Sequence, residues 1–328
     1  MSTRVVKAIR IAQNGGPEVM KLEDVPLADP GPGEVLVRHH AIGINFVDTY
    51  HRSGLYPLAM PTGLGTEGAG IVEAVGPGVT HVAAGDRVAY AARTPGSYAE
   101  ARVVSATPVV KLPDAIEFPT AAAMMLKGLT VQCLLRRTRS ELQPGDFLVW
   151  HAAAGGVGLI ACQWARALGL RLIGTAGTDD KCQLALAHGA AHAINYKTED
   201  VVARVKDITG GAKVKVVYDS VGKDTWERSL DCLQPFGLMV SFGNASGAVP
   251  PFSVGQLAAK GSLYVHRPTL NTHLTTPEVT QQMAGELFAQ VAAGMTIPVE
   301  RRYALADAAQ AHRDLESRAT TGAGVLIP

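Results

Sequence analysis

The sequence predicts an α/β protein in which a doubly wound, parallel, six-stranded sheet follows a β-rich segment. Two observations predict the sheet: a glycine-rich turn between an apolar run and a helical pattern, and a regular alternation of strand and helix signals after that turn. Strands are expected at 147–150, 171–175, 193–196, 215–219, 238–242 and 262–265. Helices are expected at 179–188, 199–209, 224–234 and 253–260. Because helical crossovers bring successive strands back in the same direction, this alternation indicates a parallel sheet.

The glycine-rich turn reads His-Ala-Ala-Ala-Gly-Gly-Val-Gly at 151–158, directly after the first expected strand. Such a turn lets backbone N–H groups approach a pyrophosphate at a helix N-terminus. Ala153 replaces the first glycine of the usual G-x-G-x-x-G pattern, so the turn alone also fits an ordinary strand–turn–helix. Its place at the first strand of the sheet favours dinucleotide binding. The buried face of the following helix is predicted by four apolar residues, Val157, Ile160, Trp164 and Leu168.

The segments before and after this alternating region have a different pattern of strand and helix signals. Up to about residue 125, short β-like runs are separated by Gly and Pro clusters such as those at 30–33 and 76–78, which predicts a β-rich domain. These runs are 5–11, 35–38, 70–75, 87–90 and 101–104. After Pro268 the pattern predicts a helix at 277–294, a strand at 298–303, a helix at 307–317 and an apolar run at 324–327. The pattern does not indicate where this tail packs.

Composition excludes several classes of protein. The 30 Lys and Arg residues against 29 Asp and Glu residues leave no basic field for nucleic acid. The four cysteines have no paired spacing, so neither a disulfide framework nor a zinc clip is indicated. The N-terminus has no apolar signal core, and no window holds the ~18 uncharged apolar residues of a membrane span. We therefore expect a soluble cytoplasmic protein with no membrane or nucleic-acid partner.

Eight segments resemble the zinc-independent quinone oxidoreductases of the medium-chain dehydrogenase/reductase superfamily, which include bacterial NADPH:quinone reductases and relatives of the ζ-crystallins. They lie at 41–50, 52–57, 65–70, 126–130, 152–158, 218–222, 242–244 and 317–320. The resemblance implies a GroES-like catalytic domain formed by 1–126 and 269–328, with a Rossmann NADPH-binding domain at 127–268 inserted in it. It also implies a homodimer.

By the same resemblance, the zinc ligands of metal-dependent relatives are replaced here. Asn45 and Thr66 stand where those relatives place a cysteine and a histidine, and the stretch near Lys127 offers no cysteine for the third ligand. Residues 90–105 lack the four-cysteine cluster of a structural zinc site. The adjacent histidines at 39–40 fall on an expected strand, where they would point to opposite faces. No metal is expected.

The cofactor is expected to be NADPH. An acidic residue that binds the ribose 2′-OH of NAD would follow the second strand, but the residues there, 175–177, are uncharged. Thr178 and Lys181 are available for a 2′-phosphate instead. Asp179 and Asp180 are unfavourable beside a phosphate, but they suit the first turn of a helix with Thr178 as its N-cap.

The resemblance also implies a set of cofactor-binding residues, although each polar member could instead be structural. The set is Asn45, Lys127, Thr130, Ala154, Gly155, Gly156, Val157, Gly177, Thr178, Lys181, Tyr196, Ser220, Phe242, Gly243, Asn244, Val265, Arg267 and Arg318.

Asn45, Tyr50 and Tyr56 are the candidate catalytic residues. A quinone accepts hydride readily, so it needs a flat apolar slot and a hydrogen-bond donor for the oxyanion formed. A phenol ring can stack and its hydroxyl can donate, while Asn45 offers an amide donor. The alternative is that both tyrosines merely pack a loop.

The sequence therefore predicts NADPH-dependent reduction of quinones by direct hydride or electron transfer without a metal. Two alternatives stay open. One is an NADPH-dependent reductase of α,β-unsaturated carbonyl compounds, and the other is a non-catalytic, crystallin-like protein that binds NADPH or RNA. Turnover of a quinone against an enone separates the first two, and RNA retention at ~150 mM salt tests the third.

Overall fold

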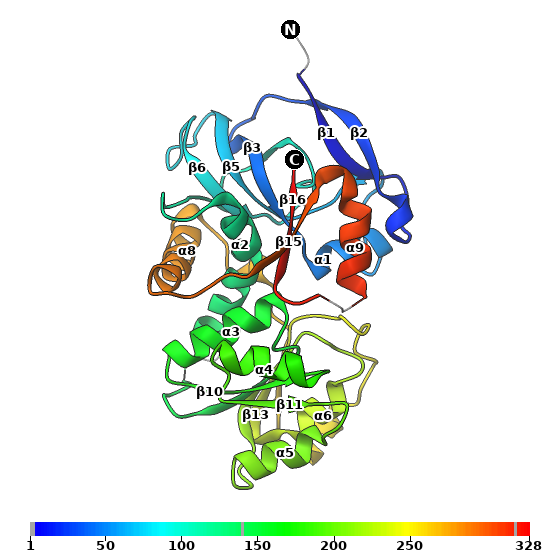
Figure 1. The fold of residues 1–328 in the computed structure, drawn as a ribbon, viewed down its shortest axis with the longest axis vertical. Helices are drawn as coiled ribbons and strands as arrows, with labels where there is room; N and C mark the ends of the chain where they lie inside the picture. Colours follow the sequence, from blue (N-terminus) through cyan, green and yellow to red (C-terminus); the bar gives the residue numbers. More distant parts are fainter. Residues whose placement is uncertain (1–3, 139–140, 318–319) are drawn as a thin grey trace. The chain divides into compact units, whose positions relative to one another are not determined.

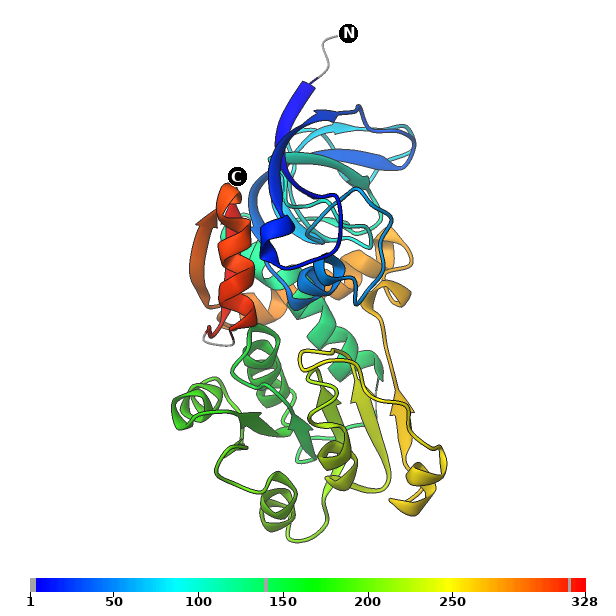
Figure 2. The same ribbon diagram turned by 90° about the vertical axis from the view of Figure 1, so that its right-hand side faces the viewer.

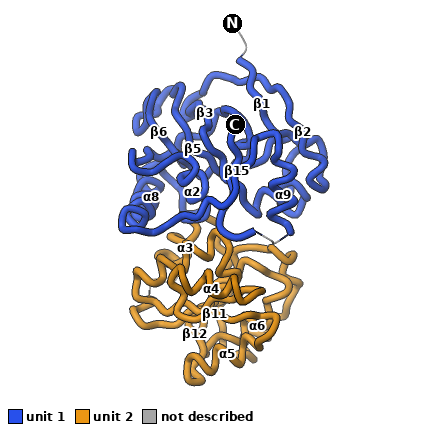
Figure 3. The backbone as a smooth tube through the Cα atoms, in the orientation of Figure 1, with its two compact units in different colours: residues 1–129, 271–328 blue, residues 130–270 orange. Residues whose placement is uncertain are grey.

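The computed structural model describes residues 4–138, 141–317 and 320–328. The chain forms two compact units, one made of 1–129 and 271–328 and the other of 130–270 (Figure 3). The two units share no sheet and each has its own buried core, so each is described by itself.

The second unit is built on a parallel six-stranded sheet, as the sequence predicts (Figure 1). Its strands lie in the order β11-β10-β9-β12-β13-β14. They are β9 (Phe147–Trp150), β10 (Arg171–Ala176), β11 (His192–Asn195), β12 (Val214–Asp219), β13 (Leu233–Ser241) and β14 (Tyr264–His266). The strand order reverses between β9 and β12, and in such sheets ligands bind outside the carboxyl ends of the strands at this point.

Helices α3 to α7 connect these strands. They are α3 (Gly156–Ala167), α4 (Asp179–Ala187), α5 (Val201–Ile208), α6 (Trp226–Asp231) and α7 (Gly255–Ala259). Each of α4 to α7 coincides with a predicted helix but is shorter at one or both ends, and α3 is the helix predicted after the glycine-rich turn. Of the four residues expected on the buried face of α3, Ile160 and Trp164 are buried as predicted. Val157 and Leu168 are only half-buried. Every residue from Gly158 to Ala165 is buried, so α3 is enclosed around its circumference rather than along one stripe.

The first unit holds two sheets. The larger has the order β15-β16-β3-β5-β6-β8, with β7 also paired to β3, and the smaller has the order β2-β1-β4. Its strands are β1 (Arg4–Ile11), β2 (Lys21–Leu27), β3 (Glu34–Gly43), β4 (Thr62–Gly63), β5 (Glu67–Val75), β6 (Arg87–Ala91), β7 (Ala101–Ser105), β8 (Val109–Lys111), β15 (Val299–Ala304) and β16 (Ala323–Ile327). On β3, His39 is buried and His40 is exposed, which confirms their opposite directions.

The C-terminal tail completes the larger sheet. Strand β16 pairs antiparallel with β3 and parallel with β15, so the two ends of the chain share one core. Figure 2 shows α9 (Ala308–Glu316) beside the N-terminal strands, and α8 (Pro277–Ala292) precedes it in the tail. Short helical turns lie at Pro17–Val19, Leu134–Thr138, Leu270–Thr272 and Leu305–Asp307.

Two helices of the N-terminal half were not predicted. Helix α1 (Phe46–Ser53) has only eight residues, too few for its period to be recognised, and α2 (Phe118–Cys133) is apolar on nearly every side, so it has no distinct polar face. The stretch Phe118–Thr138 is long and apolar enough to cross a membrane by length and composition, with a mean hydropathy of 1.3. Because 72% of its apolar window is buried, it has the character of a core helix.

Candidate active site

The turn after β9 shows how the chain accommodates Ala153 in place of a glycine. The Ala153 N–H donates to the carbonyl of Thr175 on β10 at 3.0 Å. A Cβ on Gly174 of the same strand would lie 2.6 Å from the Ala153 methyl group. Gly174 therefore provides the space that the alanine side chain takes, and the turn keeps its close packing against the sheet.

Position 158 of this segment has room only for a glycine. A Cβ there would lie 2.5 Å from the carbonyl oxygens of both Ala152 and Ala153, which are rigid backbone atoms. Helix α3 consequently begins close against the turn. Its N-cap is Gly155, which supplies no side-chain hydrogen bond to the first N–H groups. Uncapped N–H groups at the start of a twelve-residue helix fit a pyrophosphate.

The loop after β10 confirms that Asp179 and Asp180 lie in the first turn of a helix capped by Thr178. The Thr178 hydroxyl caps α4 and accepts from the Lys181 backbone N–H at 3.3 Å. Asp179 accepts from the Asn195 side-chain amide at 2.7 Å, so its carboxylate is engaged with β11. A Cβ on Gly177 would lie 2.6 Å from the Tyr196 hydroxyl, so these two candidate residues are neighbours.

The remaining strands of this sheet bring further candidate residues to the same edge. Ser220 follows β12, and a Cβ on Gly243, just after β13, would lie 2.5 Å from the Ser220 carbonyl oxygen. Arg267, after β14, donates to the Ser241 hydroxyl and to the Gly243 carbonyl, both at 3.3 Å. Thus the carboxyl ends of β9 to β14 carry most of the expected cofactor residues, including Phe242 and Asn244.

Two expected residues of the second unit stand apart from that edge. Thr130 is half-buried within α2, and Val265 is paired with Met239 inside β14. Arg318 lies outside the described residues.

Sequence reasoning missed a buried polar network beneath the strand ends. His151 contacts the Thr175 hydroxyl and the Ser229 hydroxyl, both at 2.9 Å, and Ser229 donates to Asp219 at 2.8 Å. Burial lowers the pKa of His151, which favours its neutral ring. Because the serine donates to the carboxylate rather than to the histidine, the arrangement does not activate a nucleophile. Asp219 also accepts from the N–H groups of Val221 and Gly222, and so shapes the loop at Ser220.

In the first unit, a buried cluster joins two predicted residues through one that was not predicted. Asn45, the N-cap of α1, donates from Nδ2 to Oε2 of Glu67 at 2.8 Å. Lys127 on α2 lies with Nζ 3.4 Å from the same oxygen and donates to the Ile44 carbonyl at 3.2 Å. Glu67 is fully buried, and Asn45 and Lys127 are 6% and 7% exposed.

The charge state of this cluster follows from its donors. Burial raises the pKa of Glu67, while the Lys127 ammonium and the N–H donors of Asn45 and Leu126 oppose that rise. Each hydrogen bond that the described residues make to Glu67 is donated to it, which fits an ionised carboxylate.

Asn45 of this cluster stands where the resemblance places a zinc-binding cysteine of metal-dependent relatives, and Thr66, next to Glu67, stands where it places a histidine. The Thr66 hydroxyl is buried, and no described residue forms a hydrogen bond with it. Across residues 4–138, 141–317 and 320–328, no group of three His, Cys, Asp or Glu side chains is placed to hold a metal ion.

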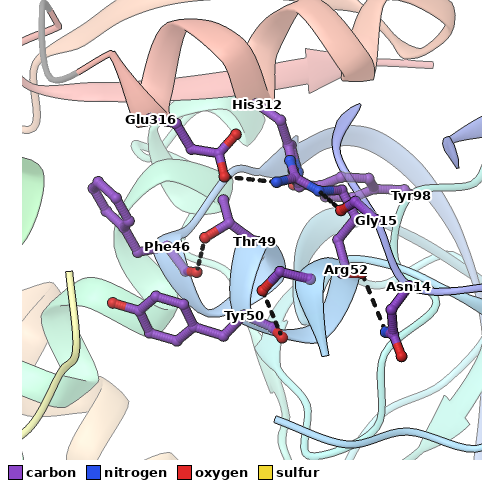
Figure 4. Close-up of polar contacts among 10 residues, drawn as sticks. Asn14, Gly15, Phe46, Thr49, Tyr50, Arg52, Tyr98, His312 and Glu316 are labelled. Carbon is purple, nitrogen blue, oxygen red and sulfur yellow. Dashed lines mark hydrogen bonds and ion pairs between the residues drawn. The ribbon is translucent and has the colours of Figure 1, made fainter. Parts of the chain in front are cut away.

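Tyr50 and Tyr56 form an aromatic pair at the end of α1. Their rings meet edge to face with centroids 5.2 Å apart, and the Tyr56 N–H donates to the Tyr50 carbonyl at 3.1 Å. The Phe46 ring lies 6.4 Å from that of Tyr50 (Figure 4). The structure thus brings together Tyr50, on the helix that Asn45 caps, and Tyr56, just after the end of that helix.

A buried network fixes α1 to the C-terminal helix α9. Arg52 donates to the Gly15 carbonyl at 3.1 Å, to Nδ1 of His312 at 2.9 Å and to Glu316 at 2.6 Å (Figure 4). Burial, followed by the Arg52 charge, lowers the pKa of His312 to about 3, so its ring is neutral. Tyr98 bridges Nε2 of His312 and Oδ2 of Asp48, both at 3.0 Å.

Comparison with known proteins gives two family matches. Residues 31–114 match the family described as alcohol dehydrogenase GroES-like domain, and residues 156–285 match that described as zinc-binding dehydrogenase. The chain is 56% identical over 326 residues to a quinone oxidoreductase of Pseudomonas aeruginosa, covering 99% of this chain and all of the relative. It is 42% identical to a 2-haloacrylate reductase from a Burkholderia species, covering 99% of each chain.

A solved structure has the same fold. The Escherichia coli quinone oxidoreductase complexed with NADPH superposes with a TM-score of 0.96 at 56% identity, covering 98% of this chain and all of that one.

Proposed function

The chain belongs to the quinone oxidoreductases of the medium-chain dehydrogenase/reductase superfamily, and on that premise we propose that it reduces quinones with NADPH without a metal. The observation that carries this proposal is the cluster of Asn45, Glu67 and Lys127. It presents amide and ammonium donors, rather than thiolate or imidazole ligands, where metal-dependent relatives hold zinc.

NADPH supplies a hydride from the nicotinamide ring when it is bound. The first-turn N–H groups of α3, around 155–157, bind its pyrophosphate. Thr178 and Lys181 bind the 2′-phosphate, and Tyr196 beside Gly177 lines the adenine. Ser220, Gly243, Asn244 and Arg267 follow the carboxyl ends of the next strands and complete the site.

Asn45, Tyr50 and Tyr56 act on the substrate. The edge-to-face pair of tyrosines offers an aromatic wall for a flat quinone ring, and the Asn45 amide donates a hydrogen bond to the oxyanion as charge develops on it. Because a quinone already accepts hydride readily, such donors suffice without a Lewis acid.

A second candidate function is reduction of α,β-unsaturated carbonyl compounds. The 42% identical 2-haloacrylate reductase carries an unsaturated acid in its name, and that chemistry needs the same hydride and the same oxyanion donor. The two functions differ only in the acceptor.

One experiment tests both. NADPH and NADH oxidation is followed at 340 nm on EDTA-treated protein, with 9,10-phenanthrenequinone or with an enone. We expect quinone-dependent oxidation of NADPH, much faster than that of NADH. Turnover of the enone alone would assign the second function, and turnover that requires added zinc would refute the metal-free mechanism.

We further propose that the protein is a cytoplasmic homodimer. Strand β14 lies at the edge of its sheet; its residues Tyr264 and Val265 are 58% and 37% exposed, and Phe236 on the neighbouring β13 is 63% exposed. They line a groove of about 530 Å³. An apolar edge strand of this kind favours pairing with a second copy. We expect light scattering to give twice the monomer mass for the native protein and the monomer mass for Val265→Lys; a monomeric native protein would refute the proposal.

A further inference from the structure

The buried carboxylate of Glu67 receives three hydrogen bonds. Asn45 Nδ2 donates to it at 2.8 Å, the Leu126 N–H at 2.7 Å and Lys127 Nζ at 3.4 Å. Glu67 begins β5, whereas its partners come from the start of α1 and from α2. One side chain therefore fixes groups that are 22 and 60 residues away in the sequence.

The backbone packs closely around the Glu67 carboxylate. A Cβ on Gly43 would lie 2.1 Å from Oε2 of Glu67 and 2.2 Å from the carbonyl oxygen of Ala122. A buried charge is costly unless it is paired and hydrogen-bonded, and here the space is kept open by a glycine at the end of β3. The carboxylate is therefore an integral part of this region.

We propose that Glu67 is a positioning residue for quinone reduction, which orients the Asn45 amide and anchors the Lys127 ammonium. This inference rests on the function proposed above. A carboxylate accepts hydrogen bonds and donates none, so it holds Nδ2 of Asn45 toward itself and excludes the amide oxygen. The second N–H of the same nitrogen then keeps a fixed direction, as an oxyanion donor requires.

Replacing Glu67 with glutamine removes this control without changing the side-chain volume. The glutamine amide both donates and accepts, so it can pair with either end of Asn45. Asn45 can then turn its oxygen where it previously turned its nitrogen, and Lys127 loses its counter-charge. Both changes weaken stabilisation of the oxyanion rather than substrate binding.

The test measures the single-turnover rate of NADPH oxidation by phenanthrenequinone in Glu67→Gln, together with the KM for the quinone and the melting temperature. We expect the rate to fall about 100-fold, the scale of losing one preorganised donor, while KM changes by less than about threefold. Glu73→Gln is the matched control, because Glu73 lies on the same strand and forms exposed ion pairs with Arg4 and Arg38. An unchanged rate in Glu67→Gln would overturn the proposal.

A double-mutant cycle separates positioning from general structural support. Because Asn45→Ala removes one of the two groups that Glu67 holds, Glu67→Gln should slow Asn45→Ala by less than about tenfold, against about 100-fold in the wild type, and the remaining loss comes from Lys127. Fully additive losses would overturn the proposal, since a structural defect adds to the loss of the donor.

Should Glu67→Gln fail to fold because Lys127 is left unpaired, Glu67→Gln/Lys127→Met removes both charges. We expect this variant to be at least about tenfold slower than Lys127→Met alone, because Asn45 is still released. Equal rates would overturn the proposal. A wild-type protein that does not oxidise NADPH with quinone would instead refute the proposed function, a result distinguishable from any of these.

Discussion

Asp48 gives the stability of this protein a pH dependence that one substitution should remove. Both of its hydrogen bonds reach the same oxygen: Oδ2 accepts from the Asn45 N–H at 2.9 Å and from the Tyr98 hydroxyl at 3.0 Å. The other oxygen is buried, and no described residue forms a hydrogen bond with it. Burial raises the pKa of Asp48 from 3.8 to about 7, against the opposing effect of the two donors.

Proton binding decides whether stability rises or falls with pH. Between the unfolded and folded pKa values the native carboxyl binds a proton that the unfolded chain has released, so stability falls as the pH rises through this range. From pH 5 to pH 8 the loss amounts to about 3 kcal/mol, at 1.36 kcal/mol for each pKa unit of difference. Asp48→Asn has nearly the same shape and does not titrate, so the loss should be absent from this variant.

The assay is urea unfolding of wild type and Asp48→Asn at intervals from pH 5 to pH 8. The variant's free energy of unfolding minus that of wild type should rise by about 3 kcal/mol over this range. The variant starts lower at pH 5, because its amide nitrogen occupies the site of the unpaired oxygen, at a cost of about 1–3 kcal/mol. Asp24→Asn is the control, since Asp24 is exposed and paired with Lys7. A difference that stays constant with pH would refute the reasoning.

Two further substitutions test the cofactor site. Gly158→Ala places a Cβ 2.5 Å from two carbonyl oxygens, so we expect NADPH to bind at least about tenfold more weakly by fluorescence titration, and stability to fall by about 1–3 kcal/mol. Gly285→Ala is its control, because that position on α8 has no atom within 4 Å; equal behaviour of the two variants would contradict the clash. Lys181→Ala should raise the Kd for NADPH about tenfold, the scale of one charged contact to the 2′-phosphate, and leave that for NADH unchanged. Equal weakening of both cofactors would exclude a 2′-phosphate contact.

Local sequence signals determined the architecture of the second unit. The alternation from 147 to 265 predicts the six strands, because periodic burial and helical crossovers are properties of short segments. The same holds for the Thr178 cap and for the opposite directions of His39 and His40, which depend on backbone geometry over a few residues.

The family resemblance supplied most of what the sequence says about the site. Its motifs name Asn45, Lys127 and the tyrosines, but they do not say what holds these residues. Ala153 is an example. Because it replaces a glycine of the usual pattern, it weakens the prediction of dinucleotide binding. Only the structure shows that Gly174 on the next strand leaves the space that the alanine methyl group fills.

The sequence by itself thus determined the strands of the second unit, and the family resemblance named the residues expected to bind the cofactor. Tertiary structure alone decided that Glu67 binds Asn45 and Lys127, and that Arg52 reaches His312 across 260 residues of sequence. It also decided that β16 completes the sheet begun by β3. The physical reason is that buried hydrogen bonds between distant segments depend on where folding brings each backbone. No local periodicity records that position.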